Sequence, residues 1–483
     1  MTSFDAGLVQ LLLGGAHILL ALGVSAHIVL TKDDVRGAIG WAGLVWLTPF
    51  LGSVLYGFFG INRIRRQAGR LRRGRELATH FTAELAVAQR DEILLPVAFP
   101  VSLHHLATLV GTATGGRLTI GNRVTALVNG DEAYPAMLAA IDRAARSVAL
   151  ETYLFDRGYA GDQFIEALGR AVKRGVAVRV LIDGVGARYS RPPAIRSLKG
   201  HGVRVALFLP PRLPVPNPYF NLRNHRKLMI VDGSVGFCGG MNIRDGCVLG
   251  RSPADATQDL HFRITGPVVK DLMGVFAFDW AFTTREQLTG GEWFPPLEPA
   301  GGIVARVVPD GPDEDFEMLL LTLMGAVSQA ERTFRLATPY FLPDAPLIDA
   351  LRIASLRGVQ VDVVLPRRGN LRLVQWAATA QLAQIVKWGC RVYLSPPPFD
   401  HSKLLVVDGM WSLVGSSNWD PRSLRLNFEC AVECYSKELA AQLDALLDAK
   451  IAAGRRLTLA DLESRSLPVK LRDGVARLAQ PYL

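Results

Sequence analysis

The sequence predicts an α/β protein built from two similar lobes with mixed sheets flanked by helices, preceded by a two-helix transmembrane hairpin. A polar motif occurs twice, 401 − 225 = 176 residues apart, and a run of alternating strand and helix patterns precedes each copy. The first 62 residues contain two long stretches without charged side chains. Hydrophobic residues make up 49% of the 483 residues and the mean hydropathy is +0.21, which is high for a chain that lies wholly in water.

The two uncharged stretches are Ala6–Thr31 and Gly37–Asn62. Each exceeds the ~20 residues that a transmembrane helix needs. The charged segment Lys32–Arg36 between them predicts a tight turn, so residues 1–62 form the predicted hairpin. Pro49 predicts a kink in the second helix. A cleaved signal peptide is disfavoured, because no basic residue precedes the first stretch and no small-residue cleavage site follows it.

The net charge of +10 is compatible with nucleic acid binding, but the distribution of the charge argues against it. Seven arginines lie between Arg63 and Arg75 with no acidic residue among them. Beside a membrane span, such a cluster attracts anionic lipid by about 1 kcal/mol per basic residue. The positive-inside rule places it in the cytosol, with the short turn outside and the N-terminus inside. Residues 63–120 are interpreted as a basic juxtamembrane segment and linker.

From residue 121 onwards, period-two and helical patterns alternate, which is typical of a mixed sheet covered by helices. In the first lobe, at 121–300, the expected elements are strands Val124–Val128, Val148–Phe155 and Val176–Ile182 and helices Ala133–Arg146 and Asp162–Lys173. The second lobe, at 301–483 with a C-terminal tail, repeats the order with strand Phe334–Thr338, helix Pro346–Arg357 and strand Val359–Leu365.

The repeated motif is His-x-Lys-x4-Asp, with an asparagine seventeen residues after the histidine. Its two copies are His225, Lys227, Asp232 and Asn242, and His401, Lys403, Asp408 and Asn418. Four apolar residues before each aspartate predict a buried strand, and residues two apart in an extended chain face the same side. Histidine can act as a nucleophile or proton donor near neutral pH, and lysine and asparagine can hold phosphoryl oxygens. Two such half-sites facing each other would act on opposite sides of one phosphorus atom.

At these residues the sequence resembles the phospholipase D superfamily, and within it the bacterial cardiolipin synthases. The resemblance rests on Asn224–Lys227, Gly239–Ile243, Thr338–Pro343, Asn418–Ser423 and Asn427–Glu429, and it runs from about residue 8 to the C-terminus. Two small residues depart from the usual pattern. Gly240 stands where the superfamily usually has serine, and Ser402 stands where this branch often has alanine. Neither departure removes a catalytic group.

The resemblance implies that the lobes pack with pseudo-two-fold symmetry and meet at the active site. It also implies that His225 is the nucleophile and His401 the general acid and base. Asp259 and Glu429, which follow the histidines of their own motifs by 34 and 28 residues, are the acids expected to orient the histidines.

Further roles are implied for the other motif residues. Asn242 and Asn418 are expected to bind the substrate, and Asp232 and Asp408 to organise the catalytic site. No cofactor is expected, and no metal, because acidic or histidine-rich clusters typical of a metal site are lacking. The five cysteines show neither paired metal spacing nor a disulfide pattern.

The implied function is transfer of a phosphatidyl group between two phosphatidylglycerol molecules, through a phosphohistidine, to give cardiolipin and glycerol. The expected partners are phosphatidylglycerol and other anionic phospholipids in a membrane, without nucleic acid, and the oligomeric state is open. The expected location is the bacterial cell (inner) membrane, as a multi-pass protein with its catalytic domain in the cytosol. Alternatives are a phospholipase D that uses water, a phosphatidyltransferase that exchanges head groups, a nuclease of the same superfamily and a non-catalytic scaffold.

Overall fold

A computed structural model of the chain describes residues 3–32, 34–60, 95–210, 222–251, 256–312 and 317–480. The chain divides into two compact units, Met1–Arg70 and Leu71–Leu483. The arginine cluster at 63–75 and the linker before residue 95 lie outside the described residues.

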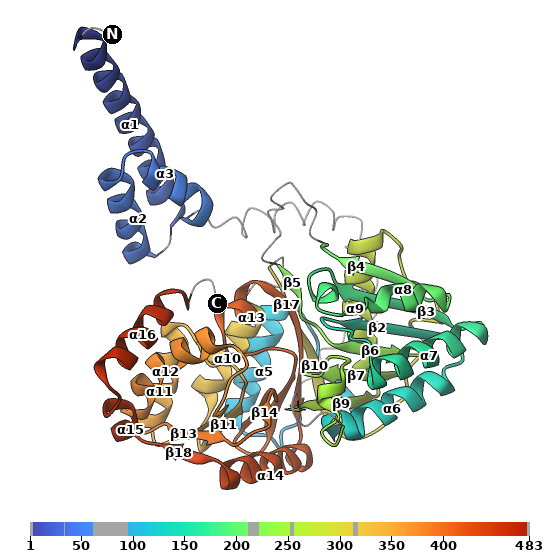
Figure 1. Ribbon diagram of the computed structural model, residues 1–483. Helices are drawn as coiled ribbons and strands as arrows, with labels where there is room; N and C mark the ends of the chain where they lie inside the picture. Colours follow the sequence, from blue (N-terminus) through green and yellow to red (C-terminus); the bar gives the residue numbers. More distant parts are fainter. Residues whose placement is uncertain are drawn as a thin grey trace. The chain divides into compact units, whose positions relative to one another are not determined.

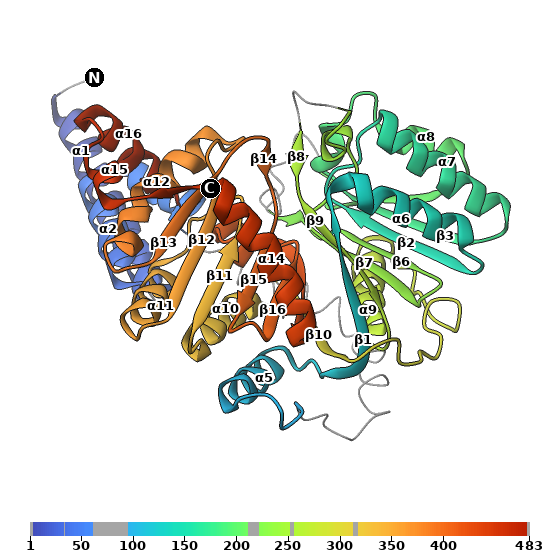
Figure 2. The same cartoon turned by 90° about the horizontal axis from the view of Figure 1, so that it is seen from below.

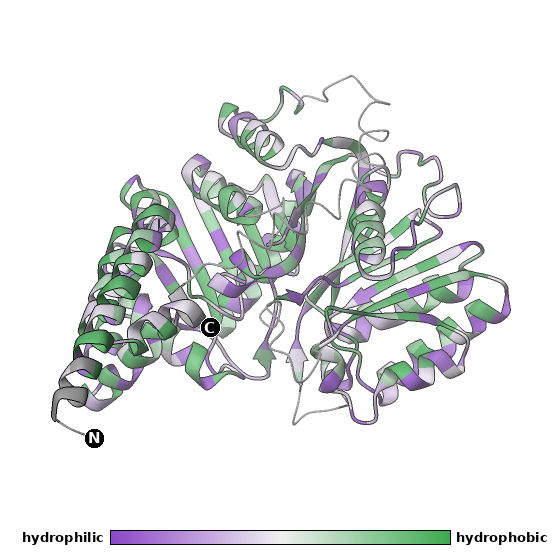
Figure 3. Cartoon of the chain, turned by 90° about the horizontal axis from the view of Figure 1, so that it is seen from above, coloured by the Kyte–Doolittle hydropathy of each residue, from purple (hydrophilic) through white to green (hydrophobic). Residues whose placement is uncertain are grey.

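The first unit contains one long helix, α1 (Ser3–Thr31), followed by α2 (Val35–Leu47), α3 (Leu51–Leu55) and a π-helical turn at Tyr56–Gly60. Within the described residues, α1 is the helix long and apolar enough to cross a membrane, over Val9–Thr31. Its outward side chains are largely aliphatic, and Figure 3 shows hydrophobic residues along most of this unit. An apolar outer surface is what a lipid-facing helix presents.

The second uncharged stretch departs from the prediction, because it is not one continuous helix. The Trp41 and Tyr56 rings lie 5.5 Å apart, and Tyr56 Oη lies 2.8 Å from Nδ1 of His27. The chain therefore doubles back after α2 (Figure 1). Pro49 has no N–H to continue a helix. At Gly52 an added Cβ would meet the carbonyl oxygen of Leu44 at 2.4 Å, so this close reversal requires glycine.

The second unit contains two lobes, and the strands of the two lobes join into one continuous sheet (Figure 1). The strands of the first lobe are β1 (Thr119–Val128), β2 (Ser147–Thr152), β3 (Ala177–Asp183), β4 (Arg204–Phe208), β5 (Arg223–Asn224), β6 (Leu228–Val231), β7 (Val235–Gly239), β8 (Thr257–Gln258) and β9 (Leu260–Thr265). Those of the second lobe are β10 (Ile303–Asp310), β11 (Thr333–Ala337), β12 (Gln360–Pro366), β13 (Arg391–Ser395), β14 (Phe399–Asp400), β15 (Leu404–Val407), β16 (Trp411–Gly415), β17 (Asn427–Tyr435) and β18 (Arg455–Leu457).

The two sheets have the same topology. The order is β1-β9-β7-β6-β2-β3-β4 in the first lobe and β10-β17-β16-β15-β11-β12-β13 in the second, where β18 adds an edge. Strands β2, β3 and β4 of the first lobe are parallel, and so are β11, β12 and β13 of the second. The other neighbouring strands in each order pair antiparallel. Strands β1 and β10 pair antiparallel and join the sheets. The duplication and the mixed sheets are therefore as the sequence predicts.

Helices cover both faces of each sheet (Figures 1 and 2). They are α5 (Val101–Thr114), α6 (Asn129–Arg143), α7 (Tyr159–Lys173), α8 (Ala194–Gly200), α9 (Val269–Thr284), α10 (Met318–Gln329), α11 (Ala345–Leu356), α12 (Arg372–Val386), α13 (Pro421–Arg425), α14 (Lys437–Ala453), α15 (Leu459–Glu463) and α16 (Leu467–Leu478). A central core joins the lobes through α9 and α14, and each lobe has a further core under its outer helices.

Most expected elements lie within a few residues of the observed ones, but the predicted linker is wrong at its C-terminal end. Residues 101–114 form α5, and Leu103, Leu106 and Val110 are fully buried in the core of the second lobe. These positions recur at helical spacing, so the segment had a core-facing stripe that its mixed composition concealed. The second lobe thus takes its first helix from residues that precede the first lobe.

Candidate active site between the lobes

Each motif histidine is placed by a short strand that crosses to the other lobe. Strand β5, which ends one residue before His225, pairs parallel with β17 of the second lobe. Strand β14, which ends before His401, pairs parallel with β8 of the first lobe. The N–H of His225 donates to the carbonyl of Phe428 at 2.9 Å, and that of His401 donates to Gln258 at 2.7 Å. Both histidines therefore lie at the junction of the lobes.

The orienting acids are exchanged between the motifs. Nδ1 of His225 lies 2.9 Å from Oε1 of Glu429, and Nδ1 of His401 lies 2.6 Å from Oδ2 of Asp259. The sequence analysis expected these two acids to orient the histidines without pairing them, and in the structure each acid contacts the histidine of the other motif. The reason is the strand pairing, because each acid directly follows the residue whose carbonyl accepts the N–H of the opposite histidine.

The two carboxylates are supported differently. Glu429 accepts hydrogen bonds from Oγ of Ser416 at 2.5 Å and from Nδ2 of Asn427 at 3.2 Å. Asp259 accepts from the N–H of Leu260 at 2.8 Å. At Gly240, which corresponds to Ser416, an added Cβ would meet Oδ1 of Asp259 at 2.3 Å. The glycine that departs from the superfamily pattern therefore makes room for the carboxylate.

The motif lysines are buried and point to the same region as the histidines. Nζ of Lys227 donates to the carbonyl of His225 at 2.6 Å, and Nζ of Lys403 donates to that of His401 at 2.6 Å. Nζ of Lys403 also lies 3.0 Å from Nδ1 of His401. Burial lowers the pKa of Lys227 to about 7 and also lowers the pKa of Lys403. A bound phosphodiester anion would offset this cost, since an adjacent anion favours the charged ammonium.

The histidine pairs have unequal electrostatics. Burial, and then the charges of Lys227 and Lys403, hold the pKa of His225 well below its usual value. Burial raises the pKa of its partner Glu429 to about 7. Burial opposes ionisation of Asp259 as well, but the charges of Lys403 and His401 outweigh it and lower the pKa of Asp259. Asp259 is therefore the carboxylate better suited to stabilise a charged imidazolium.

Asp232 and Asp408, which were expected to organise the catalytic site, lie at the opposite ends of their strands from the histidines. Seven extended residues, at about 3.3 Å each, separate each aspartate from its motif histidine. Asp232 accepts the N–H groups of Ala145, Arg146 and Ser147, and Asp408 accepts those of Glu331, Arg332 and Thr333. They anchor the turns that lead into β2 and β11 and do not line the site.

The motif asparagines take part in loop hydrogen bonds. Oδ1 of Asn242 accepts the N–H of Leu154 at 3.0 Å. Nδ2 of Asn418 donates to Oγ of Ser423 at 3.1 Å. Both asparagines are buried in the loops that follow β7 and β16. Substrate binding by these amides, as expected from the sequence, stays a prediction.

Comparison with known proteins agrees with this geometry. The family model described as "Cardiolipin synthase, PLD-like domain" matches residues 137–276 and 323–451, one segment in each lobe. The chain belongs to this family of phospholipase D-like cardiolipin synthases. It is 32% identical over 477 residues to the major cardiolipin synthase ClsA of Bacillus subtilis, covering 97% of each chain. It is 30% identical over 477 residues to a cardiolipin synthase of Listeria monocytogenes serotype 4b, covering 96% of this chain and 98% of that one.

A solved structure shares the fold. Phosphatidylserine synthase of Haemophilus influenzae matches with a TM-score of 0.61 and 15% identity, over 80% of this chain and the whole of that chain. At this identity the match supports the two-lobed fold alone.

Aromatic residues around the histidines complete the site of this family member, and sequence reasoning gave them no role. The Tyr153 ring lies 5.4 Å from that of His225, and the rings of Tyr340 and Phe399 lie 6.3 and 5.9 Å from that of His401. Their position in the sequence could have indicated them. Tyr153 comes just after β2, which pairs with β6 of the first motif, and Tyr340 comes just after β11, which pairs with β15 of the second.

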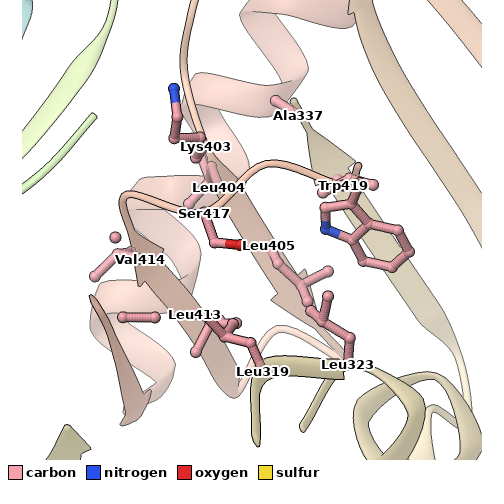
Figure 4. A pocket seen from close by; sticks show the side chains of 13 residues that line it. Leu319, Leu323, Ala337, Lys403, Leu404, Leu405, Leu413, Val414, Ser417 and Trp419 are labelled. Carbon is pink, nitrogen blue, oxygen red and sulfur yellow. The ribbon is translucent and has the colours of Figure 1, made fainter. Parts of the chain in front are cut away.

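A small cavity adjoins Lys403 in the second lobe (Figure 4). Its lining is mainly aliphatic, from α10, β15 and β16, with Ser417 and Trp419 at the edge. The ammonium of Lys403 points away from it. The cavity therefore offers no cation to a phosphate, and it belongs to the packing behind the site.

Proposed function

We propose that this protein is a cardiolipin synthase that transfers a phosphatidyl group from one phosphatidylglycerol to the terminal hydroxyl of another. The observation that carries the proposal is the pair of crossed histidine–carboxylate contacts at the junction of the lobes. One histidine can attack phosphorus while the other protonates the leaving oxygen, which is the arrangement that a two-step transfer requires.

In the first step, Nε2 of His225 attacks the phosphorus of the donor lipid. The bond from phosphorus to the glycerol head group breaks, and His401 gives its proton to the departing glycerol oxygen. Lys227 and Lys403 stabilise the charge on the non-bridging oxygens. The product of this step is a phosphatidyl group on His225 and one free glycerol.

In the second step, neutral His401 takes the proton of the terminal hydroxyl of a second phosphatidylglycerol. The resulting oxygen attacks phosphorus, the phosphorus–nitrogen bond breaks, and His225 regains its lone pair. Cardiolipin leaves, and His401 again carries a proton. The number of phosphodiester bonds is unchanged, so the equilibrium constant should lie near unity.

The assignment of roles follows from the two carboxylates. His225 donates its Nδ1–H to Glu429 and stays neutral, which leaves Nε2 free to attack. His401 is paired at 2.6 Å with Asp259, whose lowered pKa keeps it ionised. Burial and the charge of Lys403 lower the pKa of His401, and the ionised Asp259 opposes this shift by favouring the protonated acid form.

Purified enzyme supplied with phosphatidylglycerol vesicles tests the function. Cardiolipin and glycerol should appear in equal amounts, and added glycerol should convert cardiolipin back to phosphatidylglycerol. Phosphatidic acid as the main product, unaffected by the acceptor concentration, would instead identify a phospholipase D. Dependence on DNA rather than lipid would identify a nuclease.

The same proposal places the protein in the bacterial cell membrane with its lobes in the cytosol. Because the chain doubles back between α2 and α3, Tyr56 lies against His27, which is close to the charged turn at 32–36. With α1 as the crossing, the positive-inside rule puts Lys32 and Arg36 of this turn on the cytosolic side. A multi-pass hairpin, as expected from the sequence, would put Lys32 outside.

Cysteine labelling in cells distinguishes these two topologies. The five natural cysteines are buried, so an introduced thiol can be labelled selectively. In the variant Lys32→Cys, a maleimide that cannot cross membranes should react only after the cells are made permeable. Reaction in intact cells would show two crossings, with the turn outside.

A further inference from the structure

Helix α16 near the C-terminus exposes an aliphatic stripe. Leu467, Leu471, Val475 and Leu478 recur at helical spacing and are 68%, 59%, 66% and 79% exposed. The opposite face of α16 packs against α12, where Ala476 is buried with Ala377. A stripe of four exposed aliphatic residues on one side of a twelve-residue helix would be costly in water.

Basic residues flank this stripe, and the acidic residue of α16, Asp473, is paired with arginines. Lys470, Arg472 and Arg477 of α16 are exposed. Asp473 is buried and forms ion pairs with Arg465 at 2.6 Å and with Arg472 at 2.7 Å. The outer face of α16 therefore combines aliphatic side chains with positive charge, which is the pattern of a helix that lies in a membrane interface.

A chain of contacts connects α16 to the active site. Nε2 of Gln480, just beyond the helix, donates to the carbonyl oxygens of Leu342 at 3.1 Å and Pro343 at 3.3 Å. Two residues earlier in that loop, the Tyr340 ring packs near His401. Figure 1 shows the end of α16 on the same side of the second lobe as α13, which follows the second motif. The end of the helix is thus linked to the site through the loop at 340–343.

A second exposed segment lies at the same place. The hydroxyl of Tyr340 donates to Oδ1 of Asn370 at 2.8 Å. Around Asn370, Leu371 and Leu373 are 50% and 44% exposed. Three exposed arginines lie in the same segment, two before the leucines and one between them: Arg367, Arg368 and Arg372. Residues 363–399 contain no aspartate or glutamate, so this segment has no internal counter-charge.

We propose that α16 and residues 367–373 form one docking surface for an anionic phospholipid bilayer, which holds the active site against the lipid that supplies its substrate. The proposal rests on the proposed function for the nature of that lipid. Charge complementarity selects the occupant, because the exposed residues named above are aliphatic or basic, and a surface of anionic head groups over acyl chains matches both. This contact is separate from the anchor in residues 1–60.

Spin labelling of the full-length protein in phosphatidylglycerol proteoliposomes tests the docking surface. The variant Leu471→Cys carries a nitroxide on α16, and Ile353→Cys on α11 is the matched control, since these aliphatic residues are 59% and 58% exposed in the same lobe. The label at 471 should collide with oxygen and be shielded from a water-soluble nickel complex. The label at 353 should show the reverse.

Each other outcome has a definite meaning. Equal nickel access at both positions would overturn the proposal. Spin–spin broadening at 471 that disappears on dilution with unlabelled protein would also overturn it, by showing a second copy of this chain on the stripe. The result is independent of turnover. A shielded label without cardiolipin formation would contradict the proposed function, and a water-exposed label with cardiolipin formation would contradict the docking surface.

Activity provides a second test. The double variant Leu471→Asp/Val475→Asp should lose about tenfold or more of its activity on phosphatidylglycerol in bilayers, and little on detergent-dispersed lipid. The matched double variant Ile353→Asp/Leu356→Asp changes comparably exposed residues on α11 and should keep both activities. Equal activity of the two double variants on bilayers would overturn the proposal.

Discussion

The two histidine pairs are alike in geometry and different in charge. Glu429, with its pKa raised to about 7 by burial, faces a histidine that stays neutral, whereas Asp259 is held ionised by Lys403 and His401. In the proposed mechanism, this difference distinguishes the nucleophile from the acid within a pseudo-symmetric site. The residue types were predictable from the motif spacing. The exchange of acids was not, because it depends on which strand each histidine segment meets across the lobes.

The pH dependence should report two buried groups. Below about pH 7, Glu429 takes up a proton and becomes a weaker, uncharged acceptor for the Nδ1–H of His225, so kcat/KM for a soluble short-chain phosphatidylglycerol should fall. Above about pH 7, Lys227 loses its charge in the free enzyme, so kcat/KM should fall again. Bound phosphodiester raises the pKa of Lys227, so kcat should fall only at higher pH. Identical basic limbs for kcat and kcat/KM would contradict this assignment.

The space at Gly240 gives a second prediction at this scale. In Gly240→Ala, the new methyl group would overlap the carboxylate of Asp259 and displace it from His401. Activity should fall about 10–100-fold, the usual effect of losing a group that orients a reacting residue. Gly274→Ala, on α9 with no atom within 4 Å of the new Cβ, is the control and should be fully active. Full activity of Gly240→Ala would show that Asp259 does not position His401.

At the scale of elements, the short strands β5 and β14 position the motif histidines, and Asp232 and Asp408 anchor the turns that lead into β2 and β11. Strand and helix bounds in both lobes were predictable from their periodicity, because buried strands and amphipathic helices differ in period. Helix α5 was missed, since it packs in a lobe that is distant in sequence. The reversal after α2 was missed as well, because it depends on the fit of Gly52 against Leu44, which hydropathy does not record.

The anchoring role of Asp408 predicts a loss of stability and not of chemistry. Asp408 accepts three backbone N–H groups at 2.7 to 2.9 Å, and Asp408→Ala would leave them without that partner. The free energy of unfolding should fall by about 3 kcal/mol, with kcat per folded molecule nearly unchanged. Thermal melting and active-site titration measure the two quantities. Asp349→Ala, at an exposed ion pair, should change neither. A stable but inactive Asp408→Ala would place Asp408 in the chemistry.

At the scale of the whole molecule, residues from both duplicated lobes build one candidate site. Each lobe supplies a histidine and the acid for the other histidine, so the short pairings of β5 with β17 and of β14 with β8 are needed for either half-site. The repeated motif predicted a shared site. The packing that sets each histidine against the acid of the other motif became visible only in the structure.

The most direct test of this account is to isolate the covalent intermediate. Enzyme mixed briefly with phosphatidylglycerol labelled in its acyl chains and quenched under mild conditions should carry the label on the peptide that contains His225. His225→Ala should carry no label and form no cardiolipin, and His401→Ala should form the intermediate slowly and keep it longer. Label on the peptide with His401, or cardiolipin formation by His225→Ala, would contradict the account.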